Sequence, residues 1–272
     1  MKRVLSADFF DLRKSRTVYL LPLFAVLLGV LMPMMYYGIY VLFKYIGSTD
    51  TLKDNASFQS LTGMLDILNA RTVFYGSLPL SQGFGLMMTA MAGFRAARPF
   101  GTGTYRNKII AGIPRPAIYL SQSLICLLLS IVGAVLYTLS AALTSRWTFG
   151  ALDLSGKEIL SIAVFSFGIY LVYTAIPVFS AFLTRSVPLT LVISMVLPIL
   201  MQTVIQLVSP MMISAPDAIL YILAMFPSFQ GIYMTSSDPA TAILLIALAA
   251  DIVWAALLTV IGILRFKKAD VK

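Results

Sequence analysis

Long uncharged apolar runs are the feature that most restricts what this chain can fold into. The first run, from Thr17 to Phe43, holds 27 residues without a charged side chain, and similar runs recur toward the C-terminus. A helix needs about 20 apolar residues to cross the ~30 Å hydrocarbon core of a bilayer. The mean hydropathy of +0.91 agrees with this reading. The sequence therefore predicts an integral membrane protein in which residues 1–272 form a single transmembrane domain.

The spans are expected to be α-helices, because the runs are too long and too uniformly apolar for alternating membrane strands. The first run also exceeds the apolar core of a cleaved signal peptide, about 7–15 residues, so we expect it to be retained. Our prediction is an all-α polytopic membrane protein with six transmembrane helices, at 18–43, 73–94, 117–143, 159–183, 187–208 and 240–264.

The stretch 218–237 is apolar enough to suggest a seventh span. Its centre is interrupted by four residues that break or polarise a helix, Pro227, Ser228, Gln230 and Gly231. We therefore expect a short extracytoplasmic helix before the last span, which dips into the membrane or lies on its outer surface.

Composition excludes several classes of function. The chain has no histidine, a single glutamate (Glu158) and a single cysteine (Cys126). The absence of histidine removes histidine-based catalysis and most zinc sites, so no metal site, no cofactor and no enzymatic activity are predicted for this chain. One cysteine cannot form a disulfide within the chain.

The charges are distributed unevenly between the two sides of the predicted bundle. With six spans, one side carries 15 basic residues and the acids Asp8, Asp11 and Asp270; the other carries five basic residues and seven acids. Cytoplasmic loops hold the lysine and arginine excess. We therefore predict a protein of the bacterial inner membrane with both termini in the cytoplasm. The net charge of +9 therefore reflects membrane topology, and no nucleic-acid partner is expected.

The first 16 residues mix apolar and charged side chains. Apolar residues at Val4, Leu5, Phe9, Phe10 and Leu12 approximate the face of an amphipathic helix lying along the inner membrane surface. The alternative is an unstructured basic flank.

The stretch from Arg95 to Arg115 contains five cations and no acid. Positive-inside bias alone could explain those charges. Within the stretch, "TYRNKIIAG" is a short helix candidate, with Thr104 as its cap and Gly112 at its end. We expect one face of this helix to be basic and the other to be apolar through Tyr105, Ile109 and Ile110, a form that suits docking of a cytoplasmic partner. The glycines do not have the spacing of a phosphate-binding loop.

The segment "GTGTYRNKIIAGIPRPAIYLSQ" resembles the signature loop of type-2 ATP-binding-cassette permeases. The matching positions are Gly103, Thr104, Arg106, Asn107, Arg115, Ile118 and Tyr119, and the ending "GILRFKKADVK" is similar to the usual end of that family. One position departs from the pattern, because many members carry a glutamate where this chain has Pro99 beside Arg98.

The resemblance implies that the short helix is a coupling helix that seats on a separate ATPase subunit, which would bind ATP and Mg. Its contact residues would be Gly103, Thr104, Tyr105, Arg106, Asn107, Lys108 and Arg115. A second permease subunit, either an identical copy or a related chain, would complete the membrane assembly.

Polar residues inside the predicted spans are the remaining candidates. Asp251 lies in the middle of the last span, where an acid is costly and by default functional, although a shifted span would bring it nearer the surface. Gln82, Gln202 and Gln206 either pack helices together or line a transport pathway.

The leading expectation is the permease subunit of an ATP-driven exporter for an amphipathic or apolar substrate such as a peptide, a lipid or a drug. The alternative is an ATP-independent secondary transporter or channel that uses Asp251. The lack of other charges at mid-membrane weakens this alternative.

Overall fold

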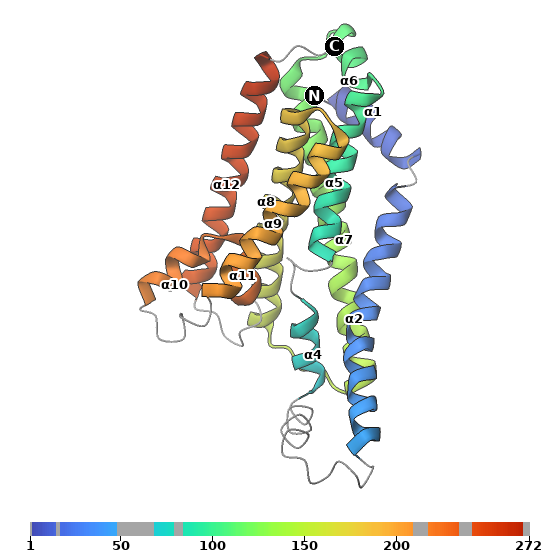
Figure 1. The fold of residues 1–272 in the computed structure, drawn as a ribbon. Coiled ribbons are helices and arrows are strands. Elements are labelled where there is room, and N and C mark those ends of the chain that lie inside the picture. Colours follow the sequence, from blue (N-terminus) through green and yellow to red (C-terminus); the bar gives the residue numbers. More distant parts are fainter. Residues whose placement is uncertain are drawn as a thin grey trace.

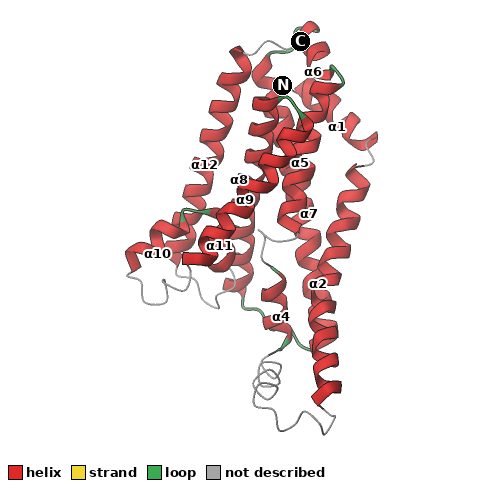
Figure 2. Ribbon diagram, viewed as in Figure 1, coloured by secondary structure: helices red, strands yellow, loops and turns green. Residues whose placement is uncertain are grey.

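The structure is a computed structural model that describes residues 2–14, 17–47, 68–78, 84–208, 217–233 and 241–268. Within those residues all regular structure is helical and no strand occurs (Figures 1 and 2). The helices are α1 (Lys2–Lys14), α2 (Thr17–Gly47), α4 (Ala70–Ser77), α5 (Phe84–Gly101), α6 (Thr104–Ile110), α7 (Arg115–Phe149), α8 (Gly156–Thr184), α9 (Val187–Val208), α10 (Asp217–Ala224), α11 (Pro227–Tyr233) and α12 (Thr241–Lys268).

Four of the described helices are long and apolar enough to cross a membrane: α2 from Tyr19 to Ile46, α7, α8 and α12. The predicted second span, 73–94, is not one helix. It is divided between α4, which ends at Ser77, and α5, which begins at Phe84. Pro79 follows the end of α4 by two residues, and proline is common just after a helix end because it lacks an N–H group and disfavours continuation of the helix. The described apolar part of α9, Val187–Met201, is shorter than the four long helices.

The outer faces of these helices are apolar. Only 22% of the most apolar window of α2, and the same share of α12, is buried within the molecule. Exposed side chains there include Leu23 at 61% and Leu245 at 60%. Such continuous apolar surface is far larger than soluble monomers present to water. Composition and exposure together place the protein in the class of helical membrane proteins.

The core of the bundle forms around α7 and α8. Helix α2 packs along α7, α12 packs along α8, and α5 contacts both α8 and α9 (Figure 1). Close approach depends on small residues, as is usual between membrane helices. At Gly29 of α2, an added Cβ would lie 2.0 Å from Ser140 Oγ of α7, so only glycine fits.

The described part of the stretch 218–237 contains no helix long enough to cross a membrane, in agreement with the prediction. Its described part consists of two short helices, α10 and α11, separated by Met225 and Phe226. Helix α11 packs against α8 and α9, and α10 contacts α12 (Figure 1).

One end of the bundle brings together α1, α6 and the last turn of α12, while α4 lies toward the opposite end (Figure 1). The N-terminal segment is helical, as expected for an amphipathic surface helix. The loop predicted at 95–116 is shorter than expected, because α5 continues to Gly101 and contains Arg95, Arg98 and Pro99. Ala96 and Ala97 extend that helix because both are strong helix formers and both are fully buried.

Candidate functional site

Helix α6 is a short helix at the end of the bundle where α1 and the end of α12 also lie (Figure 1). Its start differs from the prediction: the N-cap is Gly103, in the left-handed region at φ 70°, and Thr104 is the first helical residue. Its end agrees with the prediction. Gly112 has φ 80°, its N–H donates to Ile109 O at 3.0 Å, and the Ile113 N–H donates to Lys108 O at 3.1 Å. These two bonds form a Schellman motif, which defines the helix end sharply.

Tyr105 fastens α6 to the rest of the bundle. The side chain is 1% exposed and its hydroxyl donates to Ala96 O of α5 at 3.1 Å. Burial raises the pKa of the phenol well above its ordinary value, so the hydroxyl stays protonated as a donor. Its ring centroid lies 4.6 Å from that of Phe100 and 5.2 Å from that of Phe182.

The aromatic cluster around Tyr105 collects one ring from each of five helices. Its members are Phe100 (α5), Tyr105 (α6), Tyr119 (α7), Phe182 (α8) and Phe266 (α12). Phe182 is at the centre, with ring centroids at 4.6 Å from Tyr119 and 4.8 Å from Phe266. Because protein interiors are close-packed, a displacement of α6 would shift the rings that the other four helices contribute to the cluster.

Lys108 joins α6 to the N-terminal helix. It forms an ion pair with Asp8 of α1, and the other carboxylate oxygen of Asp8 accepts a hydrogen bond of 2.6 Å from the Ser121 hydroxyl of α7. Asp8 is 5% exposed, which makes this a largely buried pair. The sequence did not indicate this contact, because Asp8 and Lys108 are 100 residues apart.

Arg115 contacts the end of α12. Its guanidinium donates to two carbonyls in the last turn of that helix, Phe266 O at 3.2 Å and Lys267 O at 2.6 Å. Cations are favourable at helix C-termini, where the carbonyls have no partner within the helix. The contact joins the start of α7 to the end of α12.

The predicted contact residues thus separate into an anchored set and an exposed set. Tyr105, Lys108 and Arg115 hold α6 and its flanks in place, as described above. Arg106 and Asn107 are exposed, and Ile110 is 73% exposed, so it is not on the buried face that the sequence predicted. The exposed side chains of α6 are therefore Arg106, Asn107 and Ile110.

Pro99 lies inside the last turn of α5. A cavity beside it is lined by Arg95 and Arg98 of α5 and by two carboxylates from α1, Asp8 and Asp11. The acids at this place therefore come from the N-terminal helix.

Asp251 forms a second polar site, inside the bundle. It is fully buried, and its Oδ1 accepts a hydrogen bond of 3.1 Å from Gln230 Nε2 of α11. The Gln230 amide also donates to Ala224 O at 2.9 Å. Asp251 Oδ2 lies against Gly168 of α8, where a Cβ would be only 2.3 Å away. Asp251 therefore connects α12 to α8 and α11.

The structure does not describe the side chains of the other three intramembrane candidates. Gln82 is outside the described residues, and Gln202 and Gln206 belong to α9 without a description of their side chains. Among the described residues, no group of three or more histidine, cysteine, aspartate or glutamate side chains could hold a metal ion.

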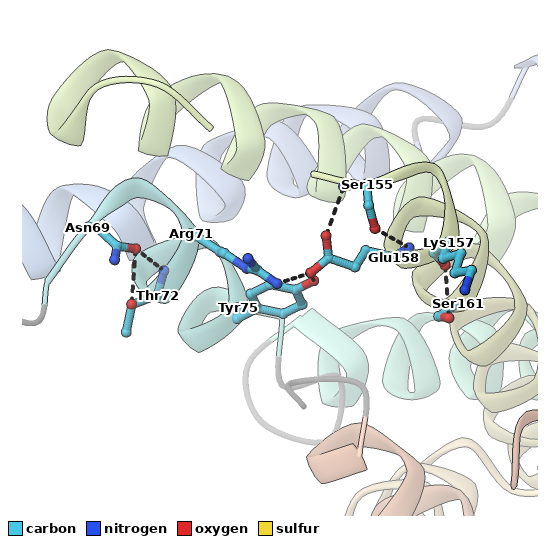
Figure 3. A network of polar contacts seen from close by, with 8 residues as sticks. All are labelled: Asn69, Arg71, Thr72, Tyr75, Ser155, Lys157, Glu158 and Ser161. Atoms are coloured by element: carbon cyan, nitrogen blue, oxygen red, sulfur yellow. Dashed lines mark hydrogen bonds and ion pairs between the residues drawn. The ribbon is translucent and has the colours of Figure 1, made fainter. Parts of the chain in front are cut away.

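A polar network at the opposite end of the bundle was not anticipated (Figure 3). Glu158, 7% exposed, forms an ion pair with Arg71 of α4 and accepts from the Tyr75 hydroxyl at 3.0 Å. Its other oxygen accepts from the Ser155 N–H at 2.8 Å, and the Glu158 N–H donates to Ser155 Oγ at 3.3 Å. This is a capping box, and the sequence signal was "SGKE", a serine followed three residues later by glutamate.

No protein-family model matches the chain, and no curated protein matches it.

Proposed function

We propose that this protein is the membrane-spanning permease subunit of an ATP-driven exporter, with α6 as the element that docks on a separate ATPase subunit. The observation that carries the proposal is the construction of α6. Arg106, Asn107 and Ile110 are exposed on a helix whose opposite face, through Tyr105, enters a cluster of rings from five helices. A push on the exposed face would reach the membrane helices through rigid contacts.

Six membrane crossings, cytoplasmic termini and a bacterial inner membrane are parts of this proposal. The resemblance of residues 103–119 to type-2 permeases supports it, as does the position of α1, α6 and the end of α12 at one end of the bundle. A second permease, identical or related, would face this one and form the pathway. ATP and Mg would bind to the ATPase subunit, and this chain would catalyse no reaction.

The expected cargo is amphipathic or apolar: a peptide, a lipid or a drug. An apolar cavity of about 540 Å³ between α7 and α8, with Phe74 of α4 at its side, is consistent with this class. Its volume is in the range of ~300–1,000 Å³ that small-molecule sites have.

The test uses the exposed face of α6. Arg106→Glu with Ile110→Glu should leave the protein folded and inserted, because both side chains are exposed. In vesicles containing the chain and an ATP-binding-cassette ATPase that co-purifies with it, the double variant should lose most of the stimulation of ATP hydrolysis. Arg146→Glu, at the far end of α7, is the matched control. Tyr105 is not suitable for such a test, since its removal would disturb the core.

Two results would contradict the proposal: full stimulation by the double variant, or transport by the chain alone without any ATPase. The second result would favour the alternative, an ATP-independent transporter or channel. The observation behind that alternative is Asp251, whose only described hydrogen-bond donor is Gln230. Under it, Asp251→Asn would abolish transport; an exporter driven through α6 should retain it.

A further inference from the structure

A cavity of about 330 Å³ lies between α1, α5 and α6, with Gln122 of α7 at its wall. Its volume falls in the range of ~300–1,000 Å³ of known ligand sites. The charged residues of its wall are Asp8, Asp11, Arg95, Arg98 and Lys108. The proposed docking of an ATPase uses the exposed face of α6 and leaves this cavity without a role.

The cations of the wall are only partly neutralised. Lys108 is paired with Asp8. Within the described residues, Arg95 and Arg98 form no ion pair, and Arg95 Nε is buried without a hydrogen-bond acceptor. A buried donor without a partner is costly, so the site favours a ligand that brings acceptor oxygens. Two guanidinium groups suit a phosphate, which can accept paired N–H bonds from each.

The surroundings of the cavity are apolar on the side where lipid would lie. Phe94, which lines the cavity, is 40% exposed, and the Arg98 guanidinium carbon lies 6.0 Å from its ring centroid. On α1, Phe9 is 40% and Phe10 is 58% exposed. Exposed aromatic side chains on a basic amphipathic helix insert at the boundary between headgroups and acyl chains. The cavity would therefore lie at the depth of the lipid headgroups, where a phospholipid can supply the phosphate group.

We propose that this cavity binds the phosphate group of a membrane phospholipid. Arg95 and Arg98 donate to the phosphate oxygens, and the hydroxyls of Thr102 and Thr104, which also line the cavity, lie 2.8 Å from each other at its edge. The acyl chains extend along Phe94. Asp11 is the remaining carboxylate of the wall without an ion pair in the described structure, and it opposes binding of an anion. The bound lipid would hold α1 against α5 and α6.

The experiment titrates the purified, delipidated full-length chain in detergent with phosphatidylglycerol and measures the one-lipid adduct by native mass spectrometry. Arg98→Gln should weaken binding about tenfold, as expected for the loss of a charge-assisted hydrogen bond, and Arg95→Gln with Arg98→Gln should weaken it further. Arg146→Gln, which removes an exposed cation at the other end of α7, should bind as the unmodified chain does.

Two further arms identify the source of the phosphate. Diacylglycerol with the same acyl chains, which lacks phosphate, should bind weakly and equally to all variants. Inorganic phosphate at millimolar concentration should not displace the phospholipid. Displacement would assign the site to a soluble phosphate and overturn the lipid proposal, and so would equal affinities for phosphatidylglycerol and diacylglycerol.

Asp11→Asn keeps the proposal testable if the double arginine variant does not fold. Asp11 and Arg98 are both exposed, so single changes there should leave the fold intact. Removing the opposing carboxylate should tighten phosphatidylglycerol binding severalfold, whereas Arg98→Gln should weaken it. If Asp11→Asn and Arg98→Gln changed the affinity in the same direction, or not at all, the assignment of the cavity would be wrong.

Discussion

At the residue scale, the position of the Asp251 side chain depends on the absence of a side chain at Gly168. Its Oδ2 fills the space that a side chain on Gly168 would occupy, and its Oδ1 accepts from Gln230. The sequence singled out Asp251 because it is an isolated acid in an apolar run. It could not reveal Gly168 or Gln230, because the three residues come from different helices and meet only when α8, α11 and α12 pack.

Gly168→Ala should destabilise the protein by about 1–3 kcal/mol, the usual cost of overpacking a tight interior. The added Cβ would lie 2.3 Å from Asp251 Oδ2, so the buried carboxylate would have to shift from its hydrogen bond with Gln230. Thermal unfolding in detergent, followed by circular dichroism, measures the change.

Gly38→Ala is the matched control, because a Cβ at Gly38 meets nothing within 4 Å. Alanine is the better helix former by about 1 kcal/mol, so this variant should be equally or more stable. The clash should also depend on the carboxylate: Gly168→Ala combined with Asp251→Ala should lose less stability than the sum of the single changes. Equal losses at Gly168 and Gly38, or strict additivity of the pair, would show that the contact does not matter.

At the scale of elements, α4 is the clearest case of a helix held by side chains from another. Its eight residues are too few for a stable isolated helix. Asn69 caps its start, accepting from the Thr72 N–H at 2.8 Å, and Arg71 and Tyr75 bind Glu158 at the start of α8 (Figure 3). Glu158 thus stabilises both α4 and the start of α8.

Glu158→Ala should cost more stability than Arg71→Ala. The carboxylate is 7% exposed and takes hydrogen bonds from α4 and from the Ser155 N–H, so its removal should cost about 1–3 kcal/mol. The Arg71 side chain is 43% exposed, and an ion pair of that kind is worth about 0–1 kcal/mol. Hydrogen exchange of the α4 amides and thermal unfolding both report the difference.

Glu158→Gln separates the two roles of Glu158. Glutamine has one acceptor oxygen, which can complete the capping box with the Ser155 N–H, but its NH2 group then replaces the oxygen that accepts from Tyr75 and pairs with Arg71. Glu158→Gln should therefore cost less stability than Glu158→Ala and more than Arg71→Ala. A loss as large as that of Glu158→Ala would mean that the contacts with α4, and not the capping box, account for the stabilisation by Glu158.

Helices were the most predictable elements, because each is encoded by consecutive residues. The ranges predicted at 117–143, 159–183, 187–208 and 240–264 all lie within observed helices, apart from Ala240, which precedes the described start of α12. The second span was wrong as a single helix, since hydropathy averages over the break between α4 and α5. The start of α6 was wrong by one residue, because Gly103 and Thr104 compete for the cap position and only geometry decides between them.

At the scale of the whole molecule, contacts between remote segments define two ends of the bundle. Lys108 and Asp8 join α6 to α1, and Arg115 joins the start of α7 to the end of α12. All of these elements lie at the end with the basic residues of α6 and of the last turn of α12. The N-terminal helix and the end of α12 should therefore face the same compartment, and positive-inside bias predicts that this compartment is the cytoplasm.

Single cysteines test this arrangement. In intact cells, a membrane-impermeant maleimide should label Asp153→Cys, and should label Thr102→Cys and Lys268→Cys only after permeabilisation. All three positions are exposed, and Cys126, which is 1% exposed, should leave the unmodified chain unlabelled. Labelling of Thr102→Cys and Lys268→Cys from opposite sides would refute an even number of crossings between them.

The sequence by itself determined the helical membrane class, most helix positions, the interruption of the apolar stretch that begins at residue 218 and the short helix after Gly103. These are properties of consecutive residues: hydropathy over the thickness of a bilayer, and glycine or proline at helix ends. Only the tertiary structure decided which face of α6 is exposed, which carboxylates contact Lys108 and Gln230, and that Arg95 and Arg98 line a cavity. The Lys108–Asp8 and Gln230–Asp251 contacts join residues 100 and 21 positions apart. The sequence around a residue does not show which distant side chain it will contact in the folded protein.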